Sequence, residues 1–209
     1  MSTPSSITLV LGGARSGKSS FAQRLAEQQS KSPLYLATAE ILDAEMAERI
    51  RMHQAKRGNQ WACVEAPLDI THIIAHPPVG RDVILVDCLT LWLSNVFLKE
   101  GATAVKTRKT ELLKVLAAPA TNVILVSNEV GMGIVPESEL GREFRDLQGW
   151  LNQDVAAVAD TVVFVAAGLP IPLKGTLPLT DGIRPCILEG GAPATPFLKQ
   201  QLALAQPSP

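Results

Sequence analysis

A glycine-rich stretch near the N-terminus has the residue types and spacing of a phosphate-binding loop. Residues 12–19 read GGARSGKS, which fits the pattern G-x-x-x-x-G-K-S. In such a loop, glycines let backbone N–H groups turn toward phosphate oxygens, the lysine reaches the β and γ phosphates, and the serine hydroxyl ligates Mg²⁺. The sequence predicts that the nucleotide-binding residues here are Gly12, Gly13, Ala14, Arg15, Ser16, Gly17, Lys18 and Ser19, with Ser19 also a metal ligand.

A carboxylate follows a second apolar run. Asp87 ends the stretch VILVD, residues 83–87. An acidic residue at the carboxyl end of a buried parallel strand points into the crevice where ligands bind. Beside a phosphate-binding loop, Asp87 is therefore predicted to hold Mg²⁺, usually through water. The alternative is an Asp that caps the following helix, and one residue could serve both purposes.

A third apolar run leads into an unusual loop. NVILVS, residues 122–127, is followed by NEVGMGIVP, so Asn128 and Glu129 are expected at the same sheet edge. Glu129 is a candidate to position substrate or metal, whereas Gly131 and Gly133 are equally compatible with a structural loop. The motif N-K-x-D, which reads guanine in switch GTPases, does not occur in the sequence.

A histidine lies between two arginines in RIRMHQAKRG, residues 49–58. Arg49, His53 and Arg57 are four residues apart, so on a helix they would share one face. Taken alone, such a charged stripe is typical of a solvated helix surface with an incidental histidine. His72 and His76, in THIIAHPP, have no comparable setting and are interpreted as structural or surface residues.

The elements that must position these residues alternate along the chain. Apolar, β-branched runs occur at 7–11, 34–37, 83–87, 122–127 and 161–166. They are almost continuously apolar, like strands buried on both faces of a parallel sheet. Helix-like segments occur at 18–28, 43–57, 90–99, 106–117 and 139–159. The last has an apolar stripe formed by Leu140, Phe144, Leu147, Leu151, Val155 and Val158. This alternation predicts an α/β fold, a doubly wound and mostly parallel sheet flanked by helices, of the RecA-like P-loop NTPase type.

The chain is predicted to form one domain with a peripheral tail. Residues 1–174 are predicted to form the P-loop domain, and the Pro/Gly-rich residues 175–209 are interpreted as a C-terminal extension of the same domain. Within this extension a short strand near 186–188 and a last helix near 197–205 are possible.

Composition excludes several functional classes. A net charge of −1 over 209 residues provides no basic surface for nucleic acid or for a membrane. Cys63, Cys88 and Cys186 are far apart and lack C-x-x-C spacing, which disfavours a disulfide framework or a cysteine zinc site. The polar start MSTPSS has no basic region of a signal peptide, and no apolar stretch is long enough to span a bilayer. We therefore expect a cytoplasmic protein with no membrane span.

The ordered set of motifs resembles one enzyme family. GGARSGKS, ATAE (37–40), RIRMHQAKR with Trp61 and Glu65, VDCLTLWLSN, SNEVGMGIVP and GLPIPLK (168–174) together resemble the bifunctional adenosylcobinamide kinase / adenosylcobinamide-phosphate guanylyltransferases of cobalamin biosynthesis. The phosphate-binding loop alone is unspecific, whereas the histidine segment and NEVGMGIVP together are specific. Gly58 stands where the family often has proline, which would change only how the preceding helix ends.

The resemblance implies two successive reactions. Members of this family phosphorylate the aminopropanol hydroxyl of adenosylcobinamide with ATP or GTP. They then move GMP from GTP onto that phosphate through a covalent GMP-histidine, which gives adenosylcobinamide-GDP and pyrophosphate. His53 matches that catalytic histidine. The resemblance further implies homotrimers, Mg²⁺ as cofactor, and nucleotide contacts beyond the loop at Ala37, Thr38, Ala39, Gln54, Ala55, Lys56, Arg57, Glu65 and Asp87.

This role would give the arginine stripe a physical purpose. A histidine nucleophile must present a neutral nitrogen, and the positive charges of Arg49 and Arg57 disfavour protonation of His53. The same arginines can neutralise the α-phosphate and the departing pyrophosphate.

Two other readings of the motifs stay open at this point. The first is a monofunctional P-loop small-molecule kinase with an inert His53, which would not retain label from α-labelled GTP. The second is a nucleotide-dependent assembly module, which would bind nucleotide without consuming cobinamide. Neither reading requires the Arg49–His53–Arg57 stripe.

Overall fold

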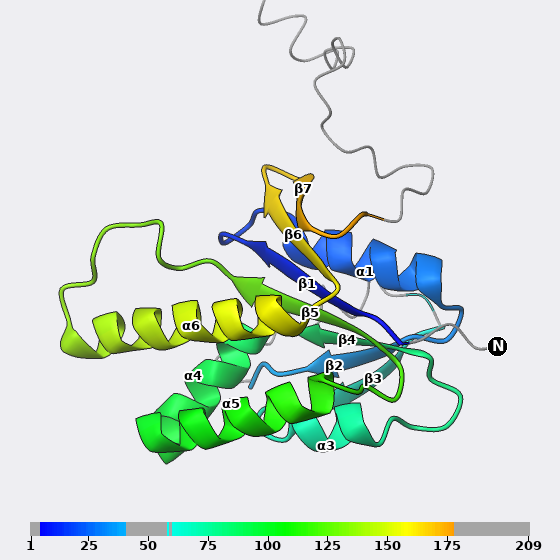
Figure 1. The fold of residues 1–209 in the computed structure, drawn as a ribbon, viewed down its shortest axis with the longest axis horizontal. Coiled ribbons are helices and arrows are strands. Elements are labelled where there is room, and N and C mark those ends of the chain that lie inside the picture. Colours follow the sequence, from blue (N-terminus) through cyan, green and yellow to red (C-terminus); the bar gives the residue numbers. More distant parts are fainter. Residues whose placement is uncertain (1–4, 41–57, 59, 178–209) are drawn as a thin grey trace, which may run out of the picture.

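The chain forms one seven-stranded sheet with helices on both of its faces (Figure 1). The computed structural model describes residues 5–40, 58 and 60–177. The strands are β1 (Ile7–Gly12), β2 (Leu34–Ala37), β3 (Ala62–Glu65), β4 (Val83–Asp87), β5 (Asn122–Asn128), β6 (Thr161–Ala166) and β7 (Leu169–Lys174). The helices are α1 (Lys18–Gln29), α3 (Ile70–Ala75), α4 (Leu89–Glu100), α5 (Ala102–Leu116) and α6 (Glu139–Val158).

The strand order is β3-β2-β4-β5-β1-β6-β7. Neighbouring strands pair in parallel, except that β6 and β7 form an antiparallel hairpin at one side of the sheet. The predicted doubly wound, mostly parallel α/β sheet is therefore confirmed. Because β1 to β6 run in parallel, their carboxyl ends meet at one edge, which is where ligands bind in sheets of this kind.

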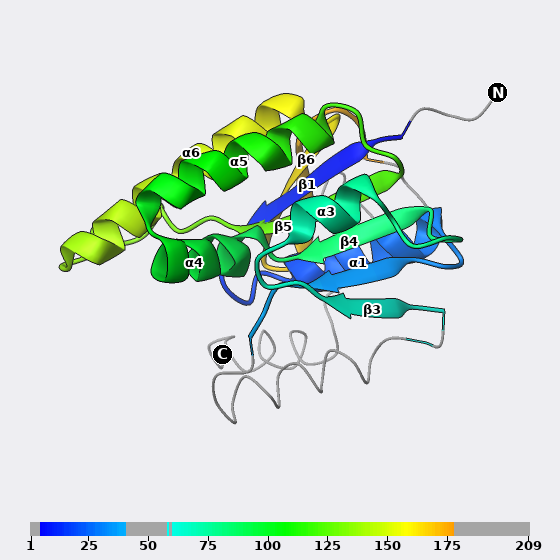
Figure 2. The ribbon, with the colours of Figure 1, turned by 90° about the horizontal axis from the view of Figure 1, so that it is seen from below.

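Two apolar cores lie on opposite faces of the sheet. On one face, α1 packs Phe21 and Leu25 against Val10 and Val126. On the other face lie α3, α4, α5 and α6, with Trp92 of α4 buried among them. Figure 2 shows α5 and α6 on one side of the strands and α1 on the other. Successive side chains of a strand face opposite sides, so strands covered on both sides lack polar alternation.

The predicted helices at 18–28, 90–99, 106–117 and 139–159 are confirmed as α1, α4, α5 and α6. The predicted apolar stripe of α6 is wrong at its two ends. Leu140 is 55% exposed and Val158 is 37% exposed, whereas Leu147, Leu151 and Val155 are buried. The first turns of α6 extend past the carboxyl edge of the sheet, so Leu140 has no strand to pack against (Figure 1).

The sequence patterns do not predict β3, α3 or β7. Strand β3 has four residues, none of them fully buried, and α3 has six. Strand β7 contains Pro170 and Pro172, which argue against a strand and are tolerated because β7 lies at the sheet edge. His72 of α3 and His76, which follows the helix, are exposed with ring centroids 5.0 Å apart, which agrees with their interpretation as surface residues.

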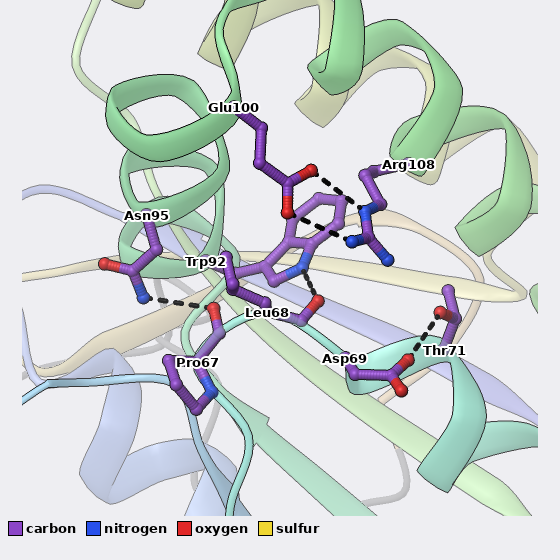
Figure 3. A network of polar contacts seen from close by, with 8 residues as sticks. All are labelled: Pro67, Leu68, Asp69, Thr71, Trp92, Asn95, Glu100 and Arg108. Carbon is purple, nitrogen blue, oxygen red and sulfur yellow. Dashed lines mark hydrogen bonds and ion pairs between the residues drawn. The ribbon is translucent and has the colours of Figure 1, made fainter.

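Helix α4, which follows β4, is tied to the connection between β3 and α3 (Figure 3). Trp92 Nε1 donates to the carbonyl of Leu68 at 2.8 Å, and Asn95 Nδ2 donates to the carbonyl of Pro67 at 3.1 Å. These bonds satisfy carbonyls that lie outside the regular ladders. They also hold the start of α4, and with it the carboxyl end of β4, in place.

Several predictions lie outside the described residues. These are the helix at 43–57, the strand at 186–188 and the helix at 197–205. The domain division at residue 174 stays a prediction, although β7 does end at Lys174 and Leu177 packs against the core on the α1 side. Among the helices that the structure describes, none combines the length and the apolar character needed to cross a bilayer.

Candidate active site

The phosphate-binding loop joins β1 to α1 at the carboxyl edge, as its sequence predicts. Gly17 precedes α1 with φ of 95°, a left-handed conformation that glycine adopts without strain. Ser16 N donates to the carbonyl of Gly13 at 3.3 Å, and Lys18 Nζ donates to the same carbonyl at 3.2 Å. The first turn of α1 contains no acidic side chain. The N-terminus of α1 is therefore open to an anion.

The β6–β7 hairpin packs against this loop. Gly168 N donates to the carbonyl of Ser16 at 2.7 Å. A Cβ atom on Gly12 would lie 2.5 Å from Val165 O, and one on Gly17 would lie 3.1 Å from Gly168 Cα. Glycine is thus required at residue 12 by packing as well as by phosphate binding. The hairpin turn fixes the shape of the loop, a role that the sequence patterns do not reveal.

Asp87 ends β4 beside the loop, and its carboxylate accepts two hydroxyl hydrogen bonds. Ser19 Oγ donates to Oδ1 at 3.3 Å, and Tyr35 OH donates to Oδ2 at 3.0 Å. The N-cap of α4 is Cys88, without a side-chain cap bond. The carboxylate of Asp87 is therefore directed at the phosphate-binding loop and not at the end of the next helix.

Ser19 and Asp87 suit Mg²⁺ by the chemistry of their donors. A hydroxyl and a carboxylate are hard oxygen ligands, and Mg²⁺ is commonly held by one or two protein oxygens together with substrate phosphates. Within residues 5–40, 58 and 60–177, no group of three or more His, Cys, Asp or Glu side chains could hold a metal ion. The two residues stay the predicted metal ligands, with nucleotide phosphates supplying the other oxygens.

Other predicted nucleotide contacts lie along the same edge. In register, Ala37 pairs with Asp87 on one side and with Glu65 on the other. Thr38 is fully buried, and its hydroxyl accepts from Cys88 N and donates to Cys88 O, both at 2.7 Å. The Thr38 side chain thus joins the ends of β2 and β4. Its backbone is also bonded, because Thr38 N donates to the carbonyl of Asp87 at 3.3 Å and Asn95 Nδ2 donates to the carbonyl of Thr38 at 2.8 Å.

The remaining predicted residues differ in exposure. Ala14 and Arg15 are exposed in the loop, and Arg15 has φ of 56°. Ala39 is half-buried just after β2, and Glu65 is exposed at the end of β3. These four residues are accessible to a ligand at the carboxyl edge.

The end of β5 lies next to the loop. Asn128 pairs with Gly12 in register, and Glu129 N donates to the carbonyl of Gly12 at 3.1 Å. Two buried polar atoms here, Ser16 Oγ and Asn128 Oδ1, have no hydrogen-bond partner among the described residues. Leaving a buried polar atom unpaired costs about 1–3 kcal/mol, so a bound ligand or water at this edge would be stabilising.

A buried polar network fixes the end of β5 to α6. Ser127 Oγ donates to Asn152 Oδ1 at 2.7 Å, and Gln148 Nε2 lies 2.9 Å from both of these oxygens. Asn152 Nδ2 donates to the carbonyl of Asn128 at 3.1 Å. All three network side chains are buried. The backbone at the end of β5 is therefore held against α6 by hydrogen bonds. The predicted apolar stripe of α6 contains no side chain that could form them.

Cys88 is a buried thiol next to Asp87, and its environment makes it inert. Burial, with the neighbouring Asp87 carboxylate adding to it, raises the pKa of the Cys88 thiol to about 11. The thiol is thus neutral near pH 7, and thiolate is the nucleophilic form of cysteine. Among the described residues Cys88 does not compete for the role of covalent nucleophile.

The predicted catalytic stripe lies outside the described residues. This applies to Arg49, His53 and Arg57 and to the predicted nucleotide contacts Gln54, Ala55 and Lys56. Glu40, the last described residue before them, follows β2 at the carboxyl edge and forms an ion pair with Lys99. The chain therefore enters residues 41–57 from the edge that carries the phosphate-binding loop.

Tyr35 is a residue of the candidate site that the sequence analysis missed. It is the one tyrosine in the chain and stands in the apolar strand LYLA. Its ring lies edge-to-face with Trp61, with centroids 6.2 Å apart, and Trp61 Nε1 donates to Glu27 at 2.9 Å. A lone hydroxyl within a buried apolar strand was the signal that could have pointed to it, because buried hydroxyls need partners.

Comparison with known sequences decides the family. A family profile described as cobinamide kinase / cobinamide phosphate guanyltransferase matches residues 8–173. The chain belongs to this family. It is 44% identical over 167 residues to the bifunctional adenosylcobalamin biosynthesis protein CobP of Pseudomonas aeruginosa, covering 80% of this chain and 96% of that relative. It is 38% identical over 179 residues to the bifunctional adenosylcobalamin biosynthesis protein CobU of Escherichia coli strain K12, covering 79% of this chain and 98% of that relative. The resemblance drawn from the motifs is confirmed.

Solved structures share the fold at low identity. A prototypical ATPase from the type III secretion system of pathogenic bacteria aligns with a TM-score of 0.51 and 13% identity, over 80% of this chain and 56% of the ATPase. A Pyrococcus horikoshii OT3 protein, PH0250, aligns with a TM-score of 0.50 and 10% identity, over 85% of this chain and 89% of that protein. These likenesses concern the fold alone, and they agree with the predicted α/β fold, a mostly parallel sheet flanked by helices.

Proposed function

We propose that this protein phosphorylates adenosylcobinamide with ATP or GTP and then transfers GMP from GTP to the new phosphate, giving adenosylcobinamide-GDP and pyrophosphate. The observation that carries the proposal is the family match over residues 8–173, which spans the phosphate-binding loop, Asp87 and His53. The relatives at 44% and 38% identity are both named as bifunctional proteins of adenosylcobalamin biosynthesis.

The kinase step depends on the phosphate-binding loop and on Asp87. Backbone N–H groups of the loop and the ammonium of Lys18 bind the β and γ phosphates. Mg²⁺, when bound, neutralises the charge that develops on the transferred phosphoryl group. Ser19 and Asp87 would hold it. Tyr35 acts through Asp87, because its hydroxyl hydrogen bond at 3.0 Å keeps the carboxylate turned toward Ser19.

The guanylyl step uses His53 as a nucleophile. A neutral ring nitrogen of His53 forms a bond to the α-phosphorus of GTP, and the bond from that phosphorus to the bridging oxygen breaks, releasing pyrophosphate. The phosphate of cobinamide phosphate then attacks the same phosphorus and returns the electron pair to His53. Arg49 and Arg57 keep the imidazole neutral and balance the charge on the phosphates.

The proposal includes the setting that the family resemblance implies. It is a cytoplasmic homotrimer that takes ATP, GTP and a corrinoid as small-molecule partners, with Mg²⁺ as cofactor. Nucleic acid is not among its partners, because the net charge of −1 provides no basic surface. Light scattering tests the assembly, with three copies of the 22.3 kDa chain as the expected mass.

Incubation with α-labelled GTP, followed by a denaturing gel, tests the function. The wild-type protein and His72→Ala, a control at an exposed histidine, should retain label, and His53→Ala should not. The label should be lost in acid and kept in alkali, as phosphoramidates behave. Cobinamide phosphorylation should survive in His53→Ala. Phosphorylation by a wild-type protein that takes no label would identify a monofunctional kinase, and nucleotide binding without either reaction would identify an assembly module.

A further inference from the structure

A cavity of about 630 Å³ lies on the α6 side of the sheet, between α6 and the β6–β7 hairpin. Figure 1 shows the hairpin at the end of the sheet beside the C-terminal half of α6. Its lining residues include Leu11, Glu129, Met132, Gly149, Gln153 and Leu173. The volume falls within the range of about 300–1,000 Å³ that is typical of small-molecule sites.

The cavity is continuous with the phosphate-binding loop. Leu11, which lines it, immediately precedes Gly12, and Glu129 N donates to the carbonyl of Gly12 at 3.1 Å. Successive side chains at a strand end point to opposite faces of the sheet. Asn128 therefore faces the α1 side, where the loop binds phosphate, and Glu129 faces the cavity. Glu129 thus lines the cavity, and its backbone is bonded to the phosphate-binding loop.

The lining suits a large amphipathic ligand. Leu11, Met132 and Leu173 provide apolar contact, and methionine adapts to irregular shapes. Glu129 and Gln153 provide polar groups among them. In the same strand as Leu173, Leu169 and Ile171 are 46% and 45% exposed. A corrinoid, with a broad apolar ring and amide groups at its rim, has this mixture of surfaces.

The hairpin is unsuited to pairing with another strand. β7 lies at the sheet edge, and two of its six residues are Pro170 and Pro172. Proline has no N–H to donate, so a regular ladder cannot continue beyond β7. A ligand on the face of the hairpin is thus favoured over a strand added at its edge.

We propose that this cavity binds the corrinoid acceptor and that Glu129 accepts the hydrogen bond of the hydroxyl to be phosphorylated. The inference rests on the proposed function. In the kinase step the hydroxyl oxygen forms a bond to the γ-phosphorus. The bond to the bridging oxygen breaks, its electron pair leaves on the nucleoside diphosphate, and the hydroxyl proton passes to Glu129.

Filling the cavity tests the location. A Cβ on Gly149 would have no atom within 4 Å beyond its own helix, so Gly149→Phe places a ring in the cavity without a clash at its base. Replacing glycine inside a helix also favours folding. Ala157→Phe is the matched control, because Ala157 is exposed on the same helix and does not line the cavity.

Gly149→Phe should raise KM for cobinamide at least tenfold, while Ala157→Phe should leave it unchanged. Both variants should keep wild-type binding of fluorescent ATP and wild-type labelling by α-labelled GTP. An unchanged KM in Gly149→Phe would overturn the assignment. So would a change of the mass in solution, measured by light scattering, because the cavity would then be a contact between copies of the chain.

Glu129→Gln tests the carboxylate. Glutamine retains an oxygen for Gly131 N, which donates to Glu129 Oε1 at 2.6 Å, so the loop keeps its local bond. The kinase kcat should fall by about 10²–10⁴-fold, with KM for cobinamide and GMP labelling retained. An unchanged kcat, or a rise in KM alone, would overturn the role of Glu129. If the wild-type protein does not phosphorylate cobinamide, the proposed function fails first; if it does and both variants behave as wild type, only this inference fails.

Discussion

Replacing Asp87 with asparagine should weaken Mg²⁺-dependent turnover far more than it weakens folding. Asparagine keeps the shape of the side chain and removes its charge. Hydrogen bonds to a charged acceptor contribute about 1.5–3 kcal/mol, and neutral ones about 0.5–1.5 kcal/mol. Ser19 and Tyr35 each donate one such bond, at 3.3 and 3.0 Å, and the site is partly exposed. The loss of unfolding free energy should therefore be no more than about 2 kcal/mol.

The metal effect should be larger, because groups that position a metal or its waters typically change affinity about 10–100-fold when removed. Initial rates of cobinamide phosphorylation over a Mg²⁺ series should show a rise of that size in the apparent Mg²⁺ constant, with partial rescue at high Mg²⁺. Nucleotide binding in EDTA should stay unchanged, because the loop amides and Lys18 remain. Tyr35→Phe, which keeps the carboxylate and removes one of its hydrogen bonds, should raise the constant by less than Asp87→Asn does. Wild-type Mg²⁺ dependence in Asp87→Asn would refute the reasoning and make Glu129 the next candidate ligand.

Three further changes test the site. Lys18→Ala should abolish both phosphorylation and GMP labelling, because the sequence contains one phosphate-binding loop; retained labelling would reveal a second nucleotide site. Gly12→Ala should lower the free energy of unfolding in urea by about 1–3 kcal/mol, since its Cβ would lie 2.5 Å from Val165 O; unchanged stability would contradict that packing. Because burial raises the pKa of Cys88 to about 11, peptide mapping after iodoacetamide at pH 8 should find Cys88 unmodified and the exposed Cys63 alkylated.

The sequence predicts the parts of the site that local pattern determines. A strand, a glycine loop and a helix follow one another within residues 7–29, so the phosphate-binding loop needs no long-range information. The position of Asp87 is also predictable from local pattern. An acidic residue after four buried apolar residues indicates the end of a buried strand, and in a parallel sheet that end lies at the edge where ligands bind. Whether Asp87 caps α4 or faces the loop, however, depends on Ser19 and Tyr35, which are 68 and 52 residues away in the chain.

Several features that the sequence does not predict depend on pairing across the sheet. β7 forms a strand in spite of two prolines because β6 provides an antiparallel partner on one side only. The contact between Gly168 and the phosphate-binding loop exists because β6 lies next to β1. The cavity requires both α6 and this hairpin. Leu140 fits the apolar periodicity of α6 but is exposed, because the first turns of α6 extend beyond the sheet. Periodicity alone does not show how far a helix extends past its sheet.

One phosphate-binding loop can serve two reactions if the two nucleophiles reach it from different directions. In the sheet, β1 has β5, β4 and then β2 on one side and the β6–β7 hairpin on the other. The segment with His53 follows β2, and the proposed acceptor cavity lies against the hairpin. In the proposed kinase step, a hydroxyl in the cavity would therefore approach the γ-phosphorus from the side of the hairpin. In the proposed guanylyl step, the new phosphate would then react with GMP on His53.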